Sequence, residues 1–84
     1  IAYKKWETEM NRLEDVLLAL VGNEEQALLK NQQIKWKELH DAEVVLIKAL
    51  YSDQPSVLSS SVTDIVRKRA FTLQSYIDLL EENK

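Results

Sequence analysis

Hydrophobic residues near the start of the chain recur at alternating intervals of four and three positions. The series is Trp6, Met10, Leu13, Leu17 and Leu20. This spacing is typical of one face of an amphipathic helix, and it predicts a helix over about residues 3–21. Gly22 can adopt the left-handed conformation that ends many helices. Asn23, with Gln26 three residues later, predicts a capping box at the start of the next helix.

The second segment, about residues 23–51, contains no Gly or Pro and is rich in residues with high helix propensity. We expect it to form the long central helix. Its first face carries Leu29, Trp36, Ile47 and Leu50, interrupted by Gln33, His40 and Glu43. A second apolar line beside that face consists of Leu28, Leu39, Ala42, Leu46 and Ala49. A helix that is apolar over so wide an arc is expected to have a neighbouring helix on each side.

The clearest break in the pattern is Ser52 to Ser56, which contains the single proline, Pro55. Proline lacks an amide donor and disfavours helix at the preceding residue. After a cluster of serines, Ser61 and Asp64 are candidate capping residues for a third helix over about residues 57–82. Its apolar stripe is Val62, Val66, Leu73, Ile77 and Leu80, with Arg69 inside it. The pattern therefore predicts an all-α fold, an antiparallel three-helix bundle formed by a single domain over residues 1–84.

Composition excludes several classes of protein. One Gly and one Pro in 84 residues are too few for the turns of a sheet protein this short. The absence of Cys excludes disulfides and thiolate metal sites. A net charge of -3 argues against binding to nucleic acid, which depends on neutralising phosphates. No apolar run approaches the length that a membrane span requires.

Several polar residues interrupt the apolar stripes or lie close to them. The structural interpretation is a buried network that fixes the register of the helices, with Arg69 bound to Glu43 or Asp41. The functional interpretation is a ligand pocket or an acid–base pair. His40 is the only histidine, lacks partners at metal-binding spacing and has no nucleophile beside it, so we predict no catalytic, cofactor or metal site and no enzyme. The candidate network is Asn11, Gln33, His40, Asp41, Glu43 and Arg69.

The stretch between the second and third predicted helices is a candidate binding loop. Loops held by a rigid scaffold often carry function, although this one can also be a simple crossover between helices. The residues that could contact a partner are Asp53, Gln54, Ser56, Ser59 and Ser60.

Short motifs along most of the chain resemble the LprI-type lysozyme-inhibitor-like domain family of bacteria. They are Glu9-Met10-Asn11, then Leu29, Gln33 and Trp36, then Asp41-Ala42-Glu43, the turn-like Ser59-Ser60-Ser61, and finally Arg69 with Leu73. The chain departs from the family at three points. Val44 and a position near Val62 stand where the family has cysteines, and His40 replaces an arginine.

The resemblance implies a non-enzymatic, protein-binding module in a periplasmic or secreted location, whose partner could be a lysozyme. The absence of cysteines leaves a cytoplasmic location open. Animal lysozymes are strongly basic, so acidic residues are candidate contacts: Glu7, Glu14, Asp15, Asp53, Asp64, Asp78, Glu81 and Glu82. The alternative is a structural or adaptor bundle that binds a partner helix or forms a homodimer, for which Leu18, Val21 and Val45 are a candidate patch.

Overall fold

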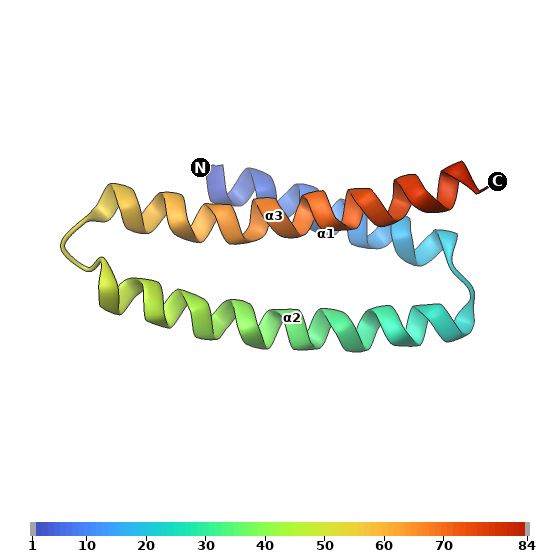
Figure 1. The fold of residues 1–84 in the computed structure, drawn as a ribbon, viewed down its shortest axis with the longest axis horizontal. Helices are drawn as coiled ribbons and strands as arrows, with labels where there is room; N and C mark the ends of the chain where they lie inside the picture. The colour runs from blue at the N-terminus through green and yellow to red at the C-terminus, as the bar shows by residue number, and fades with distance from the viewer. Residues whose placement is uncertain (1, 84) are drawn as a thin grey trace.

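The computed structural model describes residues 2–83, which form three helices (Figure 1). Helix α1 spans Ala2–Leu20, α2 spans Asn23–Leu50 and α3 spans Pro55–Glu82. No strand occurs among the described residues, so the predicted all-α fold is confirmed. Helix α2 is not longer than α3, because both contain 28 residues.

Short turns make consecutive helices run in opposite directions, and the three helices are not equally close to one another (Figure 1). Helix α1 packs along α3 over most of its length, whereas α2 contacts α3 much less and α1 least. None of the described helices is long and apolar enough to cross a membrane.

The core is the seam between α1 and α3. Its buried residues are Met10, Leu13 and Leu17 of α1 with Val66, Ala70, Leu73 and Ile77 of α3. These residues confirm the apolar stripes predicted for the first and third helices. Trp6 and Leu20 extend the α1 side, where they are partly buried against the same cluster.

Helix α2 contributes little to this core, and its one buried residue is His40. Leu29 and Trp36 are partly buried against the α1–α3 seam, but the second apolar line of α2 faces outward. Leu28, Leu39 and Leu46 are 69%, 57% and 57% exposed. Helix α2 does have α3 and α1 as neighbours, but both lie on its inner side and no described element covers this outer line.

The two turns also differ from the prediction. Gly22 has a φ of −78°, not a left-handed conformation, and it occupies the N-cap of α2 in place of Asn23. No side chain caps α2; instead the Gln26 amide donates to the carbonyl oxygen of Leu18 at 2.9 Å and fastens the end of α1 to α2. Helix α3 begins at Pro55, two residues before the predicted start. Proline suits the first turn of a helix, because an N–H at that position would have no hydrogen-bond partner within the helix.

Leu73 is 0% exposed and lies at the centre of the seam, so Leu73→Ala tests the core. We expect a loss of about 2–5 kcal/mol in the free energy of unfolding, because the truncation removes buried apolar contacts and leaves a cavity. Urea denaturation followed by circular dichroism measures it. The matched control is Leu79→Ala on the same helix, where the side chain is 57% exposed and the change should be small. Equal losses in both variants would contradict this account of the core.

Candidate functional site

Trp36 is the side chain that connects α2 to the rest of the molecule. On one side its ring lies 5.1 Å from the His40 ring, centroid to centroid, with a tilt of 32°. The Arg69 guanidinium of α3 lies over the Trp36 ring, 5.5 Å from the ring centroid. This is the geometry of a cation–π contact, and such contacts gain strength where water is excluded. Arg69, Trp36 and His40 therefore form a stack that joins α3 to α2.

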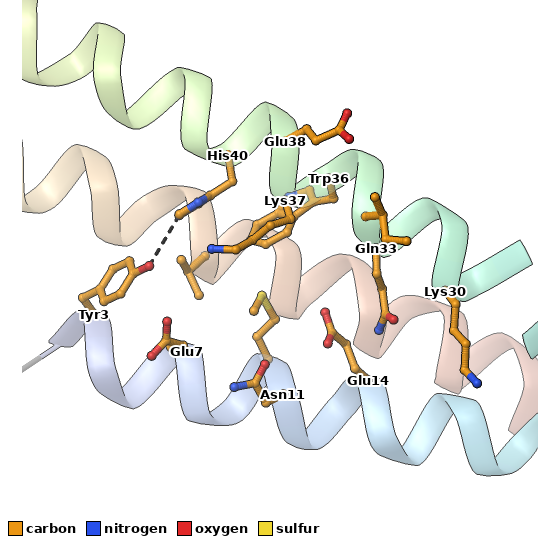
Figure 2. Close-up of a pocket in the computed structure, with 13 residues that line it drawn as sticks. Tyr3, Glu7, Asn11, Glu14, Lys30, Gln33, Trp36, Lys37, Glu38 and His40 are labelled. Atoms are coloured by element: carbon orange, nitrogen blue, oxygen red, sulfur yellow. Dashed lines mark hydrogen bonds between the residues drawn. The ribbon is translucent and has the colours of Figure 1, made fainter. Parts of the chain in front are cut away.

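His40 extends the stack to α1 (Figure 2). Asp41 Oδ1 lies 3.0 Å from His40 Nδ1, and because a carboxylate only accepts, Nδ1 donates the proton. Nε2 is then free to accept the Tyr3 hydroxyl, 3.4 Å away. The hydrogen bond from His40 also holds the pKa of Asp41 below its ordinary value. The stack thus ends in a polar bridge between α2 and the first turn of α1.

The structure brings only part of the predicted polar network together. His40 and Asp41 are bonded to each other, whereas Asn11 and Gln33 line a cleft between α1 and α2. Glu43 lies with Arg69 in a different hollow, between α2 and α3.

The predicted partner of Arg69 is wrong. Within residues 2–83 its guanidinium donates to the side-chain oxygen of Gln32 and pairs with neither Glu43 nor Asp41. Arg69 Nε is buried without a hydrogen-bond partner in the described structure. Burial lowers the pKa of Arg69, and the nearby Glu14 carboxylate opposes that shift.

A cleft of about 630 Å³ separates α1 from α2 (Figure 2). Its floor is apolar and includes Met10, Trp36 and Val66. Its two walls carry opposite charges. The α1 wall presents Tyr3, Glu7, Asn11 and Glu14 at helical spacing, and the α2 wall presents Lys30, Gln33, Lys37 and His40. Glu38 of α2 also lines the cleft, so Lys30 and Lys37 offset two of its three carboxylates.

Burial affects the ionisable groups of the α1 wall. It raises the pKa of Glu14, and the neighbouring Asp15 adds to that effect while Arg69 opposes it. Burial also raises the pKa of Tyr3, helped by the carboxylate of Glu7. Glu14 forms no ion pair within residues 2–83, whereas Glu7 lies 3.9 Å from the exposed Lys4. Glu14 is therefore a partly desolvated carboxylate without a direct counter-ion in that part of the chain.

The predicted binding loop is mostly helix. The connection between α2 and α3 consists of the cap residue Tyr51 and residues Ser52–Gln54. Ser56, Ser59 and Ser60 belong to the first turns of α3. Asp53 and Gln54 remain exposed at the tip. Pro55 starts α3 ahead of the serine cluster, so these serines lie on helical backbone.

Charged residues are distributed unevenly along the chain, and the sequence analysis did not predict this. Segments 13–29 and 70–83 contain seven carboxylates and no Lys or Arg, so their formal charge is −7 although the whole chain has -3. The end of α1, the start of α2 and the end of α3 meet at one end of the bundle (Figure 1). We call this the acidic end. The signal was visible in the sequence as two segments without a basic residue.

An apolar hollow of about 300 Å³ lies at the acidic end. It is shallow, and Tyr76 and Leu79 are 43% and 57% exposed beside it. Its lining residues are Leu17, Val21, Leu29, Tyr76, Leu79 and Leu80. Val21 lines this hollow and Leu18 lies nearby in α1, whereas Val45 lies on α2. The patch predicted from Leu18, Val21 and Val45 therefore does not form.

The model of the family described as lysozyme inhibitor LprI matches residues 1–73. The chain belongs to the LprI lysozyme inhibitor family. The match includes α1, α2 and α3 as far as the core residue Leu73. No curated protein and no solved structure matches the chain.

Two of the positions at which the chain departs from the LprI resemblance lie close together in the fold. Val44 and Val62, which stand at or near the positions of the family's cysteines, line the same hollow between α2 and α3. Both are partly buried. The chain has no cysteine, so the attachment of α2 at this hollow depends on non-covalent contacts.

Trp36→Ala tests whether the stack holds α2 in place. We expect the α2 amides to exchange hydrogen faster than in the native protein, with a smaller change in α1 and α3, because those two helices keep their own core. Hydrogen exchange measured by mass spectrometry resolves the three helices. Phe71→Ala is the control, since Phe71 is an aromatic residue packed edge-on against Trp6, away from α2. Uniform acceleration in all helices would contradict a specific role for Trp36.

Glu14→Gln tests the desolvated carboxylate. Because the pKa of Glu14 in the folded protein lies above its ordinary value of 4.5, ionising it costs folding stability, and that cost grows as the pH rises through and above 4.5. The variant should therefore be more stable than the native protein at pH 7, and the difference should vanish in acid. Thermal unfolding at a series of pH values measures it. Asp15→Asn removes the same charge from an exposed position and should stabilise less.

Proposed function

We propose that this LprI-family chain is a non-enzymatic module that binds a lysozyme and inhibits it by covering its substrate cleft. Family membership supports an inhibitor, and the acidic end supports a basic partner. The observation that carries the proposal is the segregation of charge. A concentration of carboxylates at one end attracts a basic protein more strongly than an even distribution of -3 would.

Three acidic residues lie where they weaken the fold. Asp78, Glu81 and Glu82 are in the last turns of α3, and the C-terminus of a helix carries a partial negative charge. No basic residue compensates in that last turn. A sequence that keeps carboxylates in an unfavourable position is consistent with selection for binding in preference to stability.

The apolar hollow supplies the second element of an interface. Specific interfaces have an apolar centre that excludes water and a polar rim. Tyr76 and Leu79 are exposed beside the hollow, and Asp78, Glu81 and Glu82 lie in the same turns of α3. An apolar side chain of the lysozyme would enter the hollow while its Lys or Arg residues pair with the rim.

The proposed partner also bears on location. Lysozymes act on the cell wall, outside the cytoplasm, and the resemblance implies a periplasmic or secreted protein. We therefore infer an extracytoplasmic location. The absence of Cys is compatible with it, because the helices are held by packing and by the Trp36 stack.

A second function, as an adaptor that binds a helix, is favoured by one observation. Six large apolar residues of α2 are exposed. An amphipathic helix of a partner could cover them without any contribution from the acidic end.

The test of the first function is a lysozyme activity assay with increasing amounts of protein. We expect saturable inhibition that weakens with salt, because exposed charges are screened. The triple variant Asp78→Asn, Glu81→Gln, Glu82→Gln should associate about ten-fold more slowly at low salt and approach the native rate at high salt.

The matched control removes three carboxylates elsewhere: Glu9→Gln, Glu43→Gln and Asp53→Asn. It has the same net charge as the first triple variant and should inhibit nearly as well as the native protein. If the control lost as much inhibition, the tip at Asp53 or total charge would explain binding better than the acidic end. No inhibition by the native protein, against several basic lysozymes at large excess, would reject the function itself.

A further inference from the structure

Helix α2 has an outer face that nothing described covers. We define it by the large apolar residues that are 57–69% exposed: Leu28, Ile34, Leu39, Val45, Leu46 and Leu50. By helical periodicity Leu28, Leu39, Leu46 and Leu50 form one apolar line, and Ile34 and Val45 lie on the other edge of the face, beyond Lys35 and Glu38. Exposed apolar patches of a soluble protein often mark an interaction site. The residues facing the bundle, such as Trp36 and His40, lie on the opposite side of the same helix.

The outer face contains small residues that allow close contact with another helix. By helical periodicity, Ala42 and Ala49 lie between the large apolar residues, and both are exposed. Small residues there let two helix backbones approach while the larger side chains interlock around them. We propose that the outer face binds the same face of a second copy of this chain, with the two α2 helices antiparallel.

The charged residues of the outer face favour a second copy of this chain as the partner and an antiparallel pairing of the two α2 helices. Lys35 and Glu38 are exposed within the outer face and lie 3.9 Å apart as an i,i+3 pair. In a parallel pair, Lys35 would meet Lys35 and Glu38 would meet Glu38. In an antiparallel pair with its two-fold axis at the level of Trp36 and Lys37, Lys35 of each copy meets Glu38 of the other. Opposite charges at such positions are a known device for setting direction and partner.

The same register also matches the apolar residues. Leu28 of one copy lies at the level of Leu46 of the other, and by helical periodicity the two share one edge of the face. The two-fold axis repeats this contact, as expected of an isologous interface. This arrangement therefore joins Leu28 and Leu46 of both copies, while Ile34 and Val45 lie on the opposite edge.

The distribution of charge over the whole chain favours the same direction. Segments 13–29 and 70–83 carry −7, and the remaining residues carry +4. A parallel dimer would place two acidic ends side by side, which is repulsive. The antiparallel dimer separates the acidic ends and sets each beside the more basic half of the other copy.

The available area predicts a weak dimer. A helix of 28 residues is about 42 Å long and about 12 Å wide, which gives about 500 Å² per copy and about 1,000 Å² in total. That value is at the lower limit for specific interfaces. We therefore expect reversible association in the micromolar range or weaker, with both acidic ends still accessible.

Sedimentation equilibrium, from about 10 µM to about 1 mM, tests the proposal over the range of weak affinities. The native chain should approach the dimer mass. Lys35→Glu alone and Glu38→Lys alone should each weaken dimerisation at least about ten-fold, because each places like charges in contact. An equimolar mixture of the two variants should recover it, because every contact then joins opposite charges. In a parallel dimer, a single reversal would only replace one like-charge contact by another.

The controls use matched positions away from the outer face. Glu9→Lys and Arg12→Glu reverse another exposed i,i+3 ion pair, on α1, and should not change the mass. Leu39→Asn should weaken the dimer, whereas Leu79→Asn, with the same 57% exposure on α3, should not. A native chain that is monomeric at every concentration would overturn the proposal and leave the face to a different protein. Single charge reversals without effect would overturn the antiparallel register. The control Leu79→Asn alters the hollow at the acidic end. The other variants leave the acidic end unchanged, so a loss of lysozyme inhibition in them is a separate result.

Discussion

The contact on which the arrangement of the helices depends is the stack of Arg69, Trp36 and His40. Helices α1 and α3 share an apolar seam and need no further explanation, but α2 has a single buried residue, and it is a histidine. The stack replaces the apolar packing that α2 lacks. A buried guanidinium costs desolvation, and here that cost is offset by the Trp36 ring and the Gln32 oxygen. Such contacts depend on orientation more than apolar contacts do, so they fix the register of α2.

This way of holding α2 has consequences on both of its sides. On the inner side, the stack holds α2 without closing the space between α1 and α2, and a cleft remains there. Glu14 and other polar groups line this cleft, so they are only partly removed from water. On the outer side, the apolar residues of α2 are not required by the fold of one chain, because the α1–α3 seam is complete without them. The outer face is therefore free to serve an interaction.

The sequence predicted the elements well because they depend on local periodicity. The stripes of α1 and α3, from Met10 to Leu17 and from Val66 to Ile77, are the buried residues. Two kinds of feature were not predictable from local pattern. Periodicity shows that Leu39 and Leu46 share a face but not whether anything covers it. Likewise, Gln32 and Glu43 lie on the same side of α2 as Trp36 by helical periodicity. Only the packing of α2 on α3 decides which one Arg69 reaches.

The acidic end and the outer face together limit how this LprI-family protein can work. Apart from Leu28, which lies in both, they involve different residues. In an antiparallel dimer the two α2 helices meet along their length while the acidic ends lie at opposite extremes. Each dimer would then present two separate acidic surfaces to basic partners, and occupation of one need not block the other. Two sites on one particle increase the effective affinity for a surface that carries several lysozyme molecules. A weak dimer is sufficient for this, because the second contact becomes intramolecular once the first has formed.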